Sequence, residues 1–214
     1  GVAGSSFRVE DVRFTLPAPG RHNVANALAA IAACRTLDVP LGDMVAPLAG
    51  FQGVGRRFQT VGTAHGVVVV DDFAHNADKI AAALQTAQLR AARVLAVYQP
   101  HGYGPTRFLR QDFVTTFARE LRPDDRLWML EVFYAGGTAQ RDFSAADVVA
   151  EIADRGVKAE FAPSRDWLVA RIAEAARAGD VVLVMGARDP SLTDFAREIV
   201  AAIEERTRES RADG

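Results

Sequence analysis

Residues 67–79 read Val-Val-Val-Val-Asp-Asp-Phe-Ala-His-Asn-Ala-Asp-Lys. Four β-branched residues in a row are typical of a strand buried on both faces, as in the middle of a parallel sheet. The strand ends at two adjacent carboxylates, Asp71 and Asp72. A helical pattern follows, with apolar residues four and three positions apart: Ile80, Leu84 and Ala87. The stretch therefore predicts a strand, a short loop over 73–77 and a helix.

The loop between this strand and helix is dense in polar groups. Capping of the helix start by Asn76 or Asp78 explains one or two of them. It does not explain five, and buried carboxylates and imidazoles need partners. In open α/β sheets, ligands bind at the carboxyl ends of the strands. The pattern therefore favours a functional site at this loop.

Apolar strands and helical patterns alternate along the rest of the chain. The predicted strands are four apolar runs, at 67–70, 94–97, 127–130 and 181–184. This alternation predicts an α/β fold with a mostly parallel sheet and helices on both faces. Four loops should then meet at one edge of the sheet: 71–76, 99–107, 131–138 and 186–191. We expect a binding edge there.

The two ends of the chain follow other patterns. Residues 7–16 alternate as in a strand or hairpin arm, and helices are predicted from Arg21 to about Leu37 and over 43–49. The tail, 206–214, is polar, and we expect it to be frayed. The chain begins with glycine rather than methionine, so we expect a fragment of a longer protein.

Composition narrows the class of protein. The 214 residues carry a net charge of −2, which gives no sign of a nucleic-acid or membrane partner. No apolar run approaches the roughly 20 residues of a membrane span. The single cysteine, Cys34, cannot form an intrachain disulfide, which fits a reducing compartment. We therefore expect a cytoplasmic protein.

Four motifs in order carry a resemblance to a known family. They are Gly-Arg-His-Asn-Val-Ala-Asn-Ala-Leu-Ala-Ala-Ile at 20–31, Phe-Gln-Gly-Val-Gly-Arg-Arg-Phe at 51–58, Val-Asp-Asp-Phe-Ala-His-Asn at 70–76 and Tyr-Gln-Pro-His-Gly-Tyr at 98–103. Their order and gaps resemble the Mur ligase superfamily, and within it the alanine-adding branch. The resemblance implies that residues 1–52 are the end of a central ATP-binding domain. Residues 53–214 are then a C-terminal Rossmann-like domain that brings the amino-acid acceptor.

The family chemistry forms an amide bond. The resemblance implies that ATP phosphorylates the carboxylate of a UDP-sugar substrate, UDP-N-acetylmuramate, in peptidoglycan synthesis, and that the amino group of an amino acid then attacks. It also implies Mg²⁺. The chain has no Gly-x-x-x-x-Gly-Lys-[Ser/Thr] loop and lacks the family's magnesium-binding residues of the central domain. We therefore expect ATP and Mg²⁺ to be bound mainly outside this chain, no metal ligands within it, and no activity of this chain alone.

The resemblance assigns five nucleotide contacts. His22 and Asn26 match positions near the adenine, where an amide can both donate and accept hydrogen bonds. Arg57, with Arg56 beside it, matches an arginine that reaches the nucleotide, and a guanidinium suits phosphate oxygens. Asp72 matches an aspartate that faces the ribose hydroxyls.

The acceptor side of the site follows from the same resemblance. His75 and His101 match its catalytic positions. Phe73 stands where the alanine-adding branch has tyrosine. Asn76 stands where it has histidine, and the Asn after His75 is similar to the folylpolyglutamate synthetase relatives. Together with Tyr103, these residues form the predicted acceptor pocket, and the departures leave the acceptor amino acid open.

One further departure concerns the acceptor's carboxylate. The family has arginines after its Gln-Pro-His, where this chain has Gly102 and Pro105. A carboxylate is commonly held by a fixed arginine. We therefore predict that Arg107 or Arg188 holds the acceptor. The alternative for Arg107 is a structural one, namely an ion pair with Asp112 or a cap on its own helix.

Two other classes of function stay open. One is a stand-alone, non-catalytic Rossmann-like module that binds a nucleotide or regulates another protein, which the missing phosphate loop also fits. The other is a nicotinamide enzyme, although no Gly-x-Gly-x-x-Gly follows a strand in this chain. The sequence does not define the oligomeric state.

Overall fold

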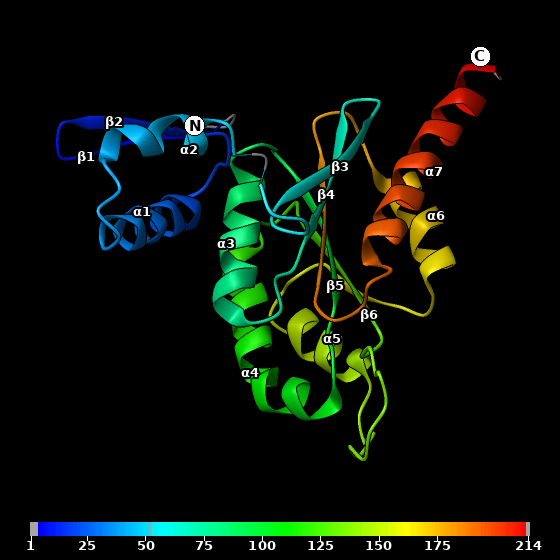
Figure 1. Cartoon of the computed structure of the whole chain (residues 1–214). Helices are drawn as coiled ribbons and strands as arrows, with labels where there is room; N and C mark the ends of the chain where they lie inside the picture. Colours follow the sequence, from blue (N-terminus) through cyan, green and yellow to red (C-terminus); the bar gives the residue numbers. More distant parts are fainter. Residues whose placement is uncertain (1–3, 52, 213–214) are drawn as a thin grey trace. The chain divides into compact units, whose positions relative to one another are not determined.

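The computed structural model describes residues 4–51 and 53–212 and divides into two compact units, Gly1–Gly55 and Arg56–Gly214 (Figure 1). The predicted domain boundary falls at residue 52, which lies outside the described residues. The compact units part a little later, after Gly55. That the first unit is the end of an ATP-binding domain stays a prediction.

The first unit packs a hairpin against short helices. Its strands β1 and β2 pair antiparallel, and the core is formed by Phe14, Ile31 and Met44. The helix predicted to reach Leu37 ends at Arg35, and the second predicted helix begins as a 3-10 turn. The elements are β1 (Ser5–Val9), β2 (Val12–Leu16), α1 (Arg21–Arg35), the 3-10 helix Leu41–Met44 and α2 (Val45–Ala49).

The second unit is built on a six-stranded sheet in the order β3-β4-β8-β5-β6-β7. All neighbouring strands are parallel except β3, which pairs antiparallel with β4. The apolar runs 67–70, 94–97, 127–130 and 181–184 all lie in parallel strands, as predicted. The strands are β3 (Gln59–Ala64), β4 (Val67–Asp72), β5 (Val94–Gln99), β6 (Arg126–Leu130), β7 (Ala159–Ala162) and β8 (Val181–Gly186).

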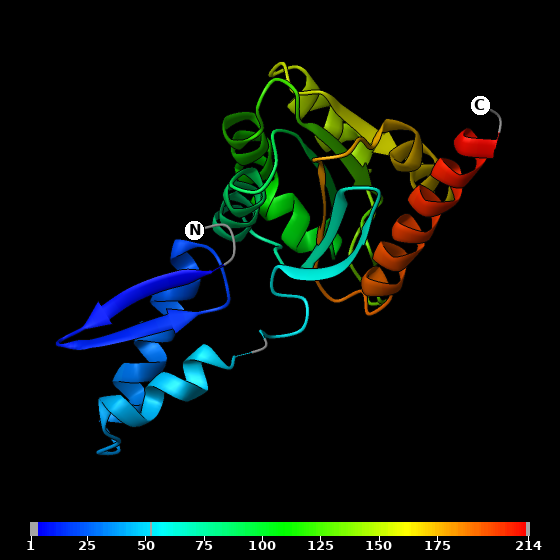
Figure 2. The same cartoon turned by 90° about the horizontal axis from the view of Figure 1, so that it is seen from above.

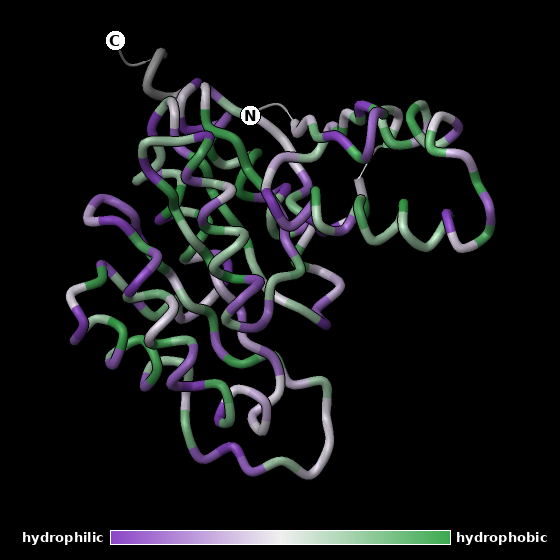
Figure 3. The backbone as a smooth tube through the Cα atoms, turned by 90° about the vertical axis from the view of Figure 1, so that its left-hand side faces the viewer, coloured by the Kyte–Doolittle hydropathy of each residue, from purple (hydrophilic) through white to green (hydrophobic). Residues whose placement is uncertain are grey.

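Helices cover both faces of this sheet, which confirms the predicted fold class (Figure 2). On one face, Ile80, Phe113 and Val148 pack against the sheet from three different helices. On the other, Leu168 and Phe195 do so from two. The first group is α3 (Ala77–Gln88), α4 (Tyr103–Glu120) and α5 (Ala145–Ala153), and the second is α6 (Arg165–Ala175) and α7 (Leu192–Ala212). Hydrophobic positions recur along these helices and strands, as their two-sided packing requires (Figure 3).

The strand order creates a point where the helices change sides. β8 lies between β4 and β5. The helices that follow β4 and β5 pack on one face, whereas α7, which follows β8, packs on the other. In open α/β sheets the loops diverge at such a switch point and leave a crevice at the carboxyl ends of the strands. The loops after β4, β8 and β5 therefore surround the predicted binding edge.

The expectation of a frayed tail from Arg206 onward was wrong for the residues that the structure describes. α7 continues to Ala212, and residues 213–214 lie outside the described part. The Arg206 side chain donates from Nη1 to the carbonyl oxygen of Ala173, at 2.8 Å. This contact with the end of α6 ties the last turns of α7 to the unit. None of the described helices is both long enough and apolar enough to cross a lipid bilayer.

Candidate functional site

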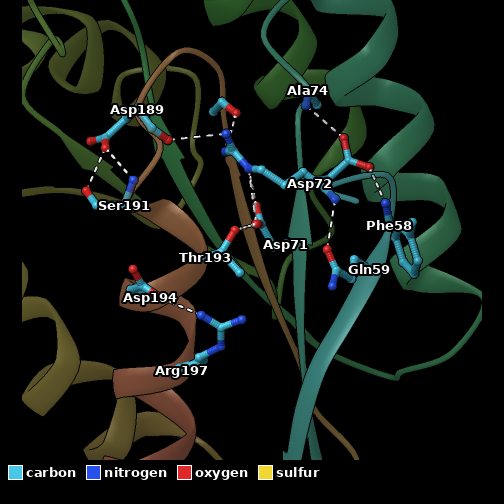
Figure 4. Close-up of polar contacts among 12 residues, drawn as sticks. Phe58, Gln59, Asp71, Asp72, Ala74, Asp189, Ser191, Thr193, Asp194 and Arg197 are labelled. Atoms are coloured by element: carbon cyan, nitrogen blue, oxygen red, sulfur yellow. Dashed lines mark hydrogen bonds and ion pairs between the residues drawn. The ribbon is translucent and has the colours of Figure 1, made fainter. Parts of the chain in front are cut away.

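The first carboxylate after the buried strand, Asp71, is fully buried and serves the fold (Figure 4). A buried carboxylate is stable only when it is paired and hydrogen-bonded. The Nε atom of Arg56 lies 3.1 Å from its Oδ2, and the Thr193 hydroxyl donates to the same oxygen at 2.5 Å. Asp71 thus joins the start of the unit to β4 and to the first turn of α7.

The second carboxylate, Asp72, is also nearly buried, with 9% of its surface exposed. Its Oδ2 accepts the backbone N–H of Phe58 and its Oδ1 that of Ala74, both at 2.7 Å (Figure 4). These bonds fix the turn that leads out of β4. The predicted contact of Asp72 with a ribose is untested by this geometry and stays a prediction.

Arg56 holds three segments together instead of projecting from the edge. Besides the pair with Asp71, its Nη2 donates to the carbonyl oxygen of Gly186 at 2.9 Å and its Nη1 to that of Asp189 at 3.2 Å. All three guanidinium nitrogens therefore donate within the unit. Its guanidinium carbon also lies 5.1 Å from the centre of the Phe73 ring. These bonds give Arg56 a structural role, and its predicted contact with the nucleotide stays a prediction.

Arg57 is the contrasting neighbour. Its side chain is exposed, and its guanidinium carbon lies 5.6 Å from the centre of the Phe73 ring. It makes no hydrogen bond or ion pair with any residue that the structure describes. A stacked guanidinium keeps its donors for an anion. Of the predicted arginine pair, Arg57 is the one whose geometry suits a phosphate.

His75 and His101 come together, as expected for residues of one site. Their ring centres are 5.6 Å apart at 71°. Nδ1 of His75 lies 2.8 Å from the carbonyl oxygen of Phe73. A carbonyl can only accept, so Nδ1 carries the proton and Nε2 of the neutral ring keeps a lone pair. Phe73 also meets the His75 ring edge-on, at 5.4 Å.

The backbone of His101 is fixed by pairing that continues past the end of β5. His101 forms a parallel bridge with Phe133. The N–H of Gly102 donates to the Phe133 carbonyl, and the N–H of Phe133 donates to the Pro100 carbonyl, both at 2.8 Å. Burial lowers the pKa of His101, and the charges of His75 and Arg188 lower it further. His101 is therefore a neutral imidazole at pH 7.

Strand register brings Arg188 to the same edge. β8 pairs with both neighbours, with Asp72 opposite Met185 and Gln99 opposite Gly186. Arg188 follows Met185 by three residues, as His75 follows Asp72. It follows Gly186 by two residues, as His101 follows Gln99. Arg188, His75 and His101 thus follow the ends of three adjacent strands.

Two other predicted pocket residues, Asn76 and Tyr103, have structural roles. The Asn76 side chain caps α3 by accepting the Lys79 N–H at 3.1 Å, which is the capping alternative named above. The Tyr103 ring is buried edge-on against Tyr134 and Phe143. The predicted contacts of Asn76 and Tyr103 with the acceptor stay predictions.

Arg107 also turns away from the predicted pocket. It pairs with Asp142 and donates to the carbonyl oxygen of Gln140 at 3.3 Å. Its guanidinium carbon lies 5.6 Å from the centre of the Phe143 ring. The predicted alternative for Arg107 was an ion pair with Asp112. Arg107 does form an ion pair, but its partner is Asp142. The loop between β6 and α5 folds back onto α4 and supplies that partner.

A buried polar network at the β8 loop has no counterpart in the sequence analysis. Arg165 pairs with Asp189, donates to Gln99 Oε1 at 3.0 Å and to the Ser191 hydroxyl at 2.8 Å. Burial alone raises the pKa of Asp189, but hydrogen bonds from Ser191 and the Arg165 charge outweigh it and hold that pKa below its usual value. Asp189 and Ser191 appear in Figure 4. The only sequence signal was that Asp189 and Ser191 lie in a predicted edge loop.

The remaining predicted contacts, His22 and Asn26, belong to the first unit. Both lie near the start of α1, where His22 is half-buried and Asn26 is exposed. Exposure leaves the Asn26 amide accessible to a ligand. Among the described residues, no group of three or more His, Cys, Asp or Glu side chains is arranged to hold a metal ion.

Comparison with known proteins places this geometry in a family. Residues 56–188 match the family model described as "Mur ligase, glutamate ligase domain". The UDP-N-acetylmuramate–L-alanine ligase of Pelotomaculum thermopropionicum is 38% identical over 176 residues, which cover 81% of this chain and 37% of that protein. That of Mycolicibacterium gilvum is 39% identical and covers 96% of this chain and 43% of that protein.

A solved structure agrees with these matches. The UDP-N-acetylmuramate–alanine ligase MurC of Thermotoga maritima aligns with a TM-score of 0.67 at 26% identity, over 93% of this chain and 40% of that chain. The present chain thus spans about two fifths of the length of the relatives it matches. On the match of its second unit to the family model, the chain belongs to the Mur ligase family.

Proposed function

We propose that this chain is the C-terminal, acceptor-binding part of an ATP-dependent amide ligase that joins an amino acid to UDP-N-acetylmuramate in peptidoglycan synthesis. In this proposal residues 1–52 are the end of the central ATP-binding domain, and residues 53–214 are the acceptor domain. The observation that carries it is the meeting of His75 and His101 at the switch point of the sheet. The similarity to alanine ligases supports the reaction class.

The two imidazoles suit an amine nucleophile. An amino acid carries an ammonium group at neutral pH, and this group must lose a proton before it can attack an activated carboxyl. His75 has its lone pair on Nε2, because Nδ1 donates to the Phe73 carbonyl. His101 has a lowered pKa and is neutral at pH 7. Either ring can accept the proton, which is the role of a general base.

Arg57 suits the nucleotide side. When bound, ATP supplies the phosphoryl group that activates the sugar carboxylate. Arg57 is exposed over Phe73, and a guanidinium binds phosphate oxygens bidentately. We propose that Arg57, and not Arg56, contacts the phosphates. The chemistry of Asn26, His22 and Asp72 also fits an adenine and a ribose. We further propose that the rest of the protein binds Mg²⁺ and most of the ATP, and that the protein is cytoplasmic.

The test uses the longer parent protein and this chain side by side. With UDP-N-acetylmuramate, ATP, Mg²⁺ and a panel of amino acids, the parent should release ADP and form an amide product detectable by mass spectrometry. Replacing His75 by asparagine should lower the turnover rate by about 10²–10⁴-fold, the usual contribution of a general base. The chain alone should release no phosphate, since positioning and charge neutralisation supply most of phosphoryl-transfer catalysis.

Two results would count against the proposal. One is a parent protein that binds nucleotide but forms no amide with any amino acid, which is the behaviour of a regulatory module. The other is phosphate release by the chain alone that disappears in Arg57→Ala, because this would mean that the chain carries its own ATPase site.

A further inference from the structure

Four acidic side chains around the binding edge are engaged inside the unit. Asp71 accepts from Arg56 and Thr193. The next carboxylates along the edge are engaged in the same way. Asp72 accepts two backbone N–H groups, Asp189 pairs with Arg165, and Glu131 accepts the Ser144 hydroxyl and two backbone N–H groups. Because these four carboxylates already have partners, they are not available to pair with an arginine beside them.

The arginines of the edge divide into two groups. Arg56, Arg107 and Arg165 are bound to carboxylates of the unit. Arg57 and Arg188 are exposed, and neither makes a hydrogen bond or ion pair with the described residues. Arg57 is the one proposed above to contact phosphates, which leaves Arg188. An unpaired guanidinium at a switch point, among acids that already have partners, is suited to an anionic ligand.

The backbone at Arg188 is also unusual. Its φ is +67°, in the left-handed region that favours glycine. The next residue holds this conformation in place, because the Asp189 N–H donates to the Ala187 carbonyl at 2.9 Å and its carboxylate binds Arg165 and Ser191. A residue whose backbone is kept in an unfavourable conformation by its surroundings is a feature of ligand-binding loops.

The strand order determines which loops lie beside the loop of Arg188. β8 is hydrogen-bonded to β4 on one side and to β5 on the other. The loop that carries Arg188 therefore lies between the loops that carry His75 and His101. The two imidazole rings are themselves 5.6 Å apart. The edge thus combines an exposed cation on the middle loop with two proton acceptors.

We infer that Arg188 binds the carboxylate of the amine acceptor and so selects acceptors that carry one. This inference rests on the proposed function. An amino acid presents a carboxylate and an ammonium group on the same carbon atom, and the edge offers a partner for each: the Arg188 guanidinium for the first and the imidazoles of His75 and His101 for the second. The family positions after Gln-Pro-His hold Gly102 and Pro105 here, which cannot supply this cation. Arg107 cannot either, since it is paired with Asp142.

The charge on Arg188 also affects the pKa of His101. It is one of the causes that lower the pKa of His101, after burial and the charge of His75. Removing it should therefore raise the pKa of His101, while a merely exposed arginine far from the site should not affect that pKa. This shift reports whether Arg188 stands beside His101 in solution, independently of any ligand.

The experiment titrates this chain with L-alanine and, separately, with L-alaninamide, which keeps the amine and lacks the carboxylate. Binding and the His101 pKa are both read from the imidazole NMR signals. In Arg188→Gln, affinity for L-alanine should fall roughly 10- to 100-fold, the range for losing a hydrogen bond to a charged group, and affinity for L-alaninamide should stay the same. Arg188→Lys should restore part of the affinity, because lysine keeps the positive charge but cannot donate two parallel hydrogen bonds to a carboxylate as a guanidinium does.

Arg197→Gln is the matched control. Arg197 is exposed on α7 and pairs only with Asp194, one turn away (Figure 4). It should change neither the affinity for L-alanine nor the His101 pKa. Three results would overturn the inference: a wild-type chain that binds both compounds equally or neither, unchanged L-alanine binding in Arg188→Gln, or loss of binding in Arg107→Gln instead. Failure of the proposed function would be seen separately, as a parent protein that forms no amide while Arg188 still binds carboxylates.

Discussion

The guanidinium of Arg56 lies 3.1 Å from the carboxylate of Asp71, whose side chain is completely buried. The pair joins residues at the start of the second unit and at the end of β4. The same guanidinium reaches carbonyl oxygens of Gly186 and Asp189, more than 100 residues along the chain. These contacts hold the β4 and β8 ends of the binding edge in one position.

Arg56→Gln should therefore destabilise the second unit strongly. It leaves the buried Asp71 carboxylate with only the Thr193 hydroxyl, and breaking a buried pair from one side costs about 3–5 kcal/mol. Urea unfolding followed by circular dichroism measures the free energy of unfolding. Arg197→Gln is the control, since its ion pair with Asp194 is exposed on both sides and should contribute less than about 1 kcal/mol. Equal effects of the two substitutions would show that the Arg56 network is not a structural anchor.

His101 should make the stability depend on pH. Its pKa is lower in the folded chain than the ordinary value of 6.5, chiefly through burial. The unfolded chain then binds more protons between the two pKa values, so the free energy of unfolding falls as pH drops below about 6.5 and through the folded pKa. Urea unfolding at pH 7.5 and pH 5.5 should show this loss in the wild type and a smaller loss in His101→Gln. If both proteins lose stability equally over this range, other groups cause the effect.

Four of the strands of the second unit could be predicted because they are largely buried on both faces. Four such runs, at 67–70, 94–97, 127–130 and 181–184, lie in four parallel strands. The insertion of β8 between β4 and β5 could not be predicted, because strand order depends on packing between helices distant in sequence. This insertion is what places the loop of Arg188 between the loops of His75 and His101.

The sequence could not predict which arginines are paired inside the unit and which are exposed. Arg56 and Arg57 are adjacent and chemically equivalent, yet the first is held inside the unit and the second is exposed over Phe73. The partners of Arg56 lie as far as 133 residues away, so no local pattern distinguishes the two. Arg107 was similarly ambiguous, because its partner Asp142 comes from the loop after β6. The resemblance pointed to one edge of the sheet but did not indicate which charges there are paired inside the unit.

Asn76 should contribute to stability as a helix cap. Its side chain accepts the Lys79 N–H at the start of α3, and replacing such a cap by alanine costs about 0.5–2 kcal/mol. Asn76→Asp should be nearly neutral, because a carboxylate can accept the same bond and suits the positive end of the helix. Thermal unfolding of the three proteins makes the comparison. A stable Asn76→Ala protein with weakened L-alanine binding would instead support the pocket role predicted from the sequence.

Two glycines at the binding edge should respond in opposite ways to alanine. A Cβ added at Gly186 would lie 2.7 Å from Leu192 Cδ1 and 3.0 Å from the backbone oxygen of Gln99, whereas one at Gly104 would meet nothing within 4 Å. The Leu192 side chain can move, but the Gln99 carbonyl belongs to the neighbouring strand, two residues before His101. Gly186→Ala should therefore force β8 and β5 apart and cost about 1–3 kcal/mol, as overpacking usually does. Gly104 lies in the first turn of α4, and Gly104→Ala should gain about 0.4–1 kcal/mol by restricting the unfolded chain.

Urea unfolding gives the sign of each change, and the imidazole NMR signal of His101 shows whether the edge has moved. Gly186→Ala should shift that signal as well as lower the stability, because β5 carries His101 directly after its last residues. A stability loss without any shift would mean that Leu192 alone absorbs the added methyl group and that the β5 end stays in place. A gain in stability for Gly186→Ala would contradict the close packing of β8 against β5, the strands that lead into the loops of Arg188 and His101.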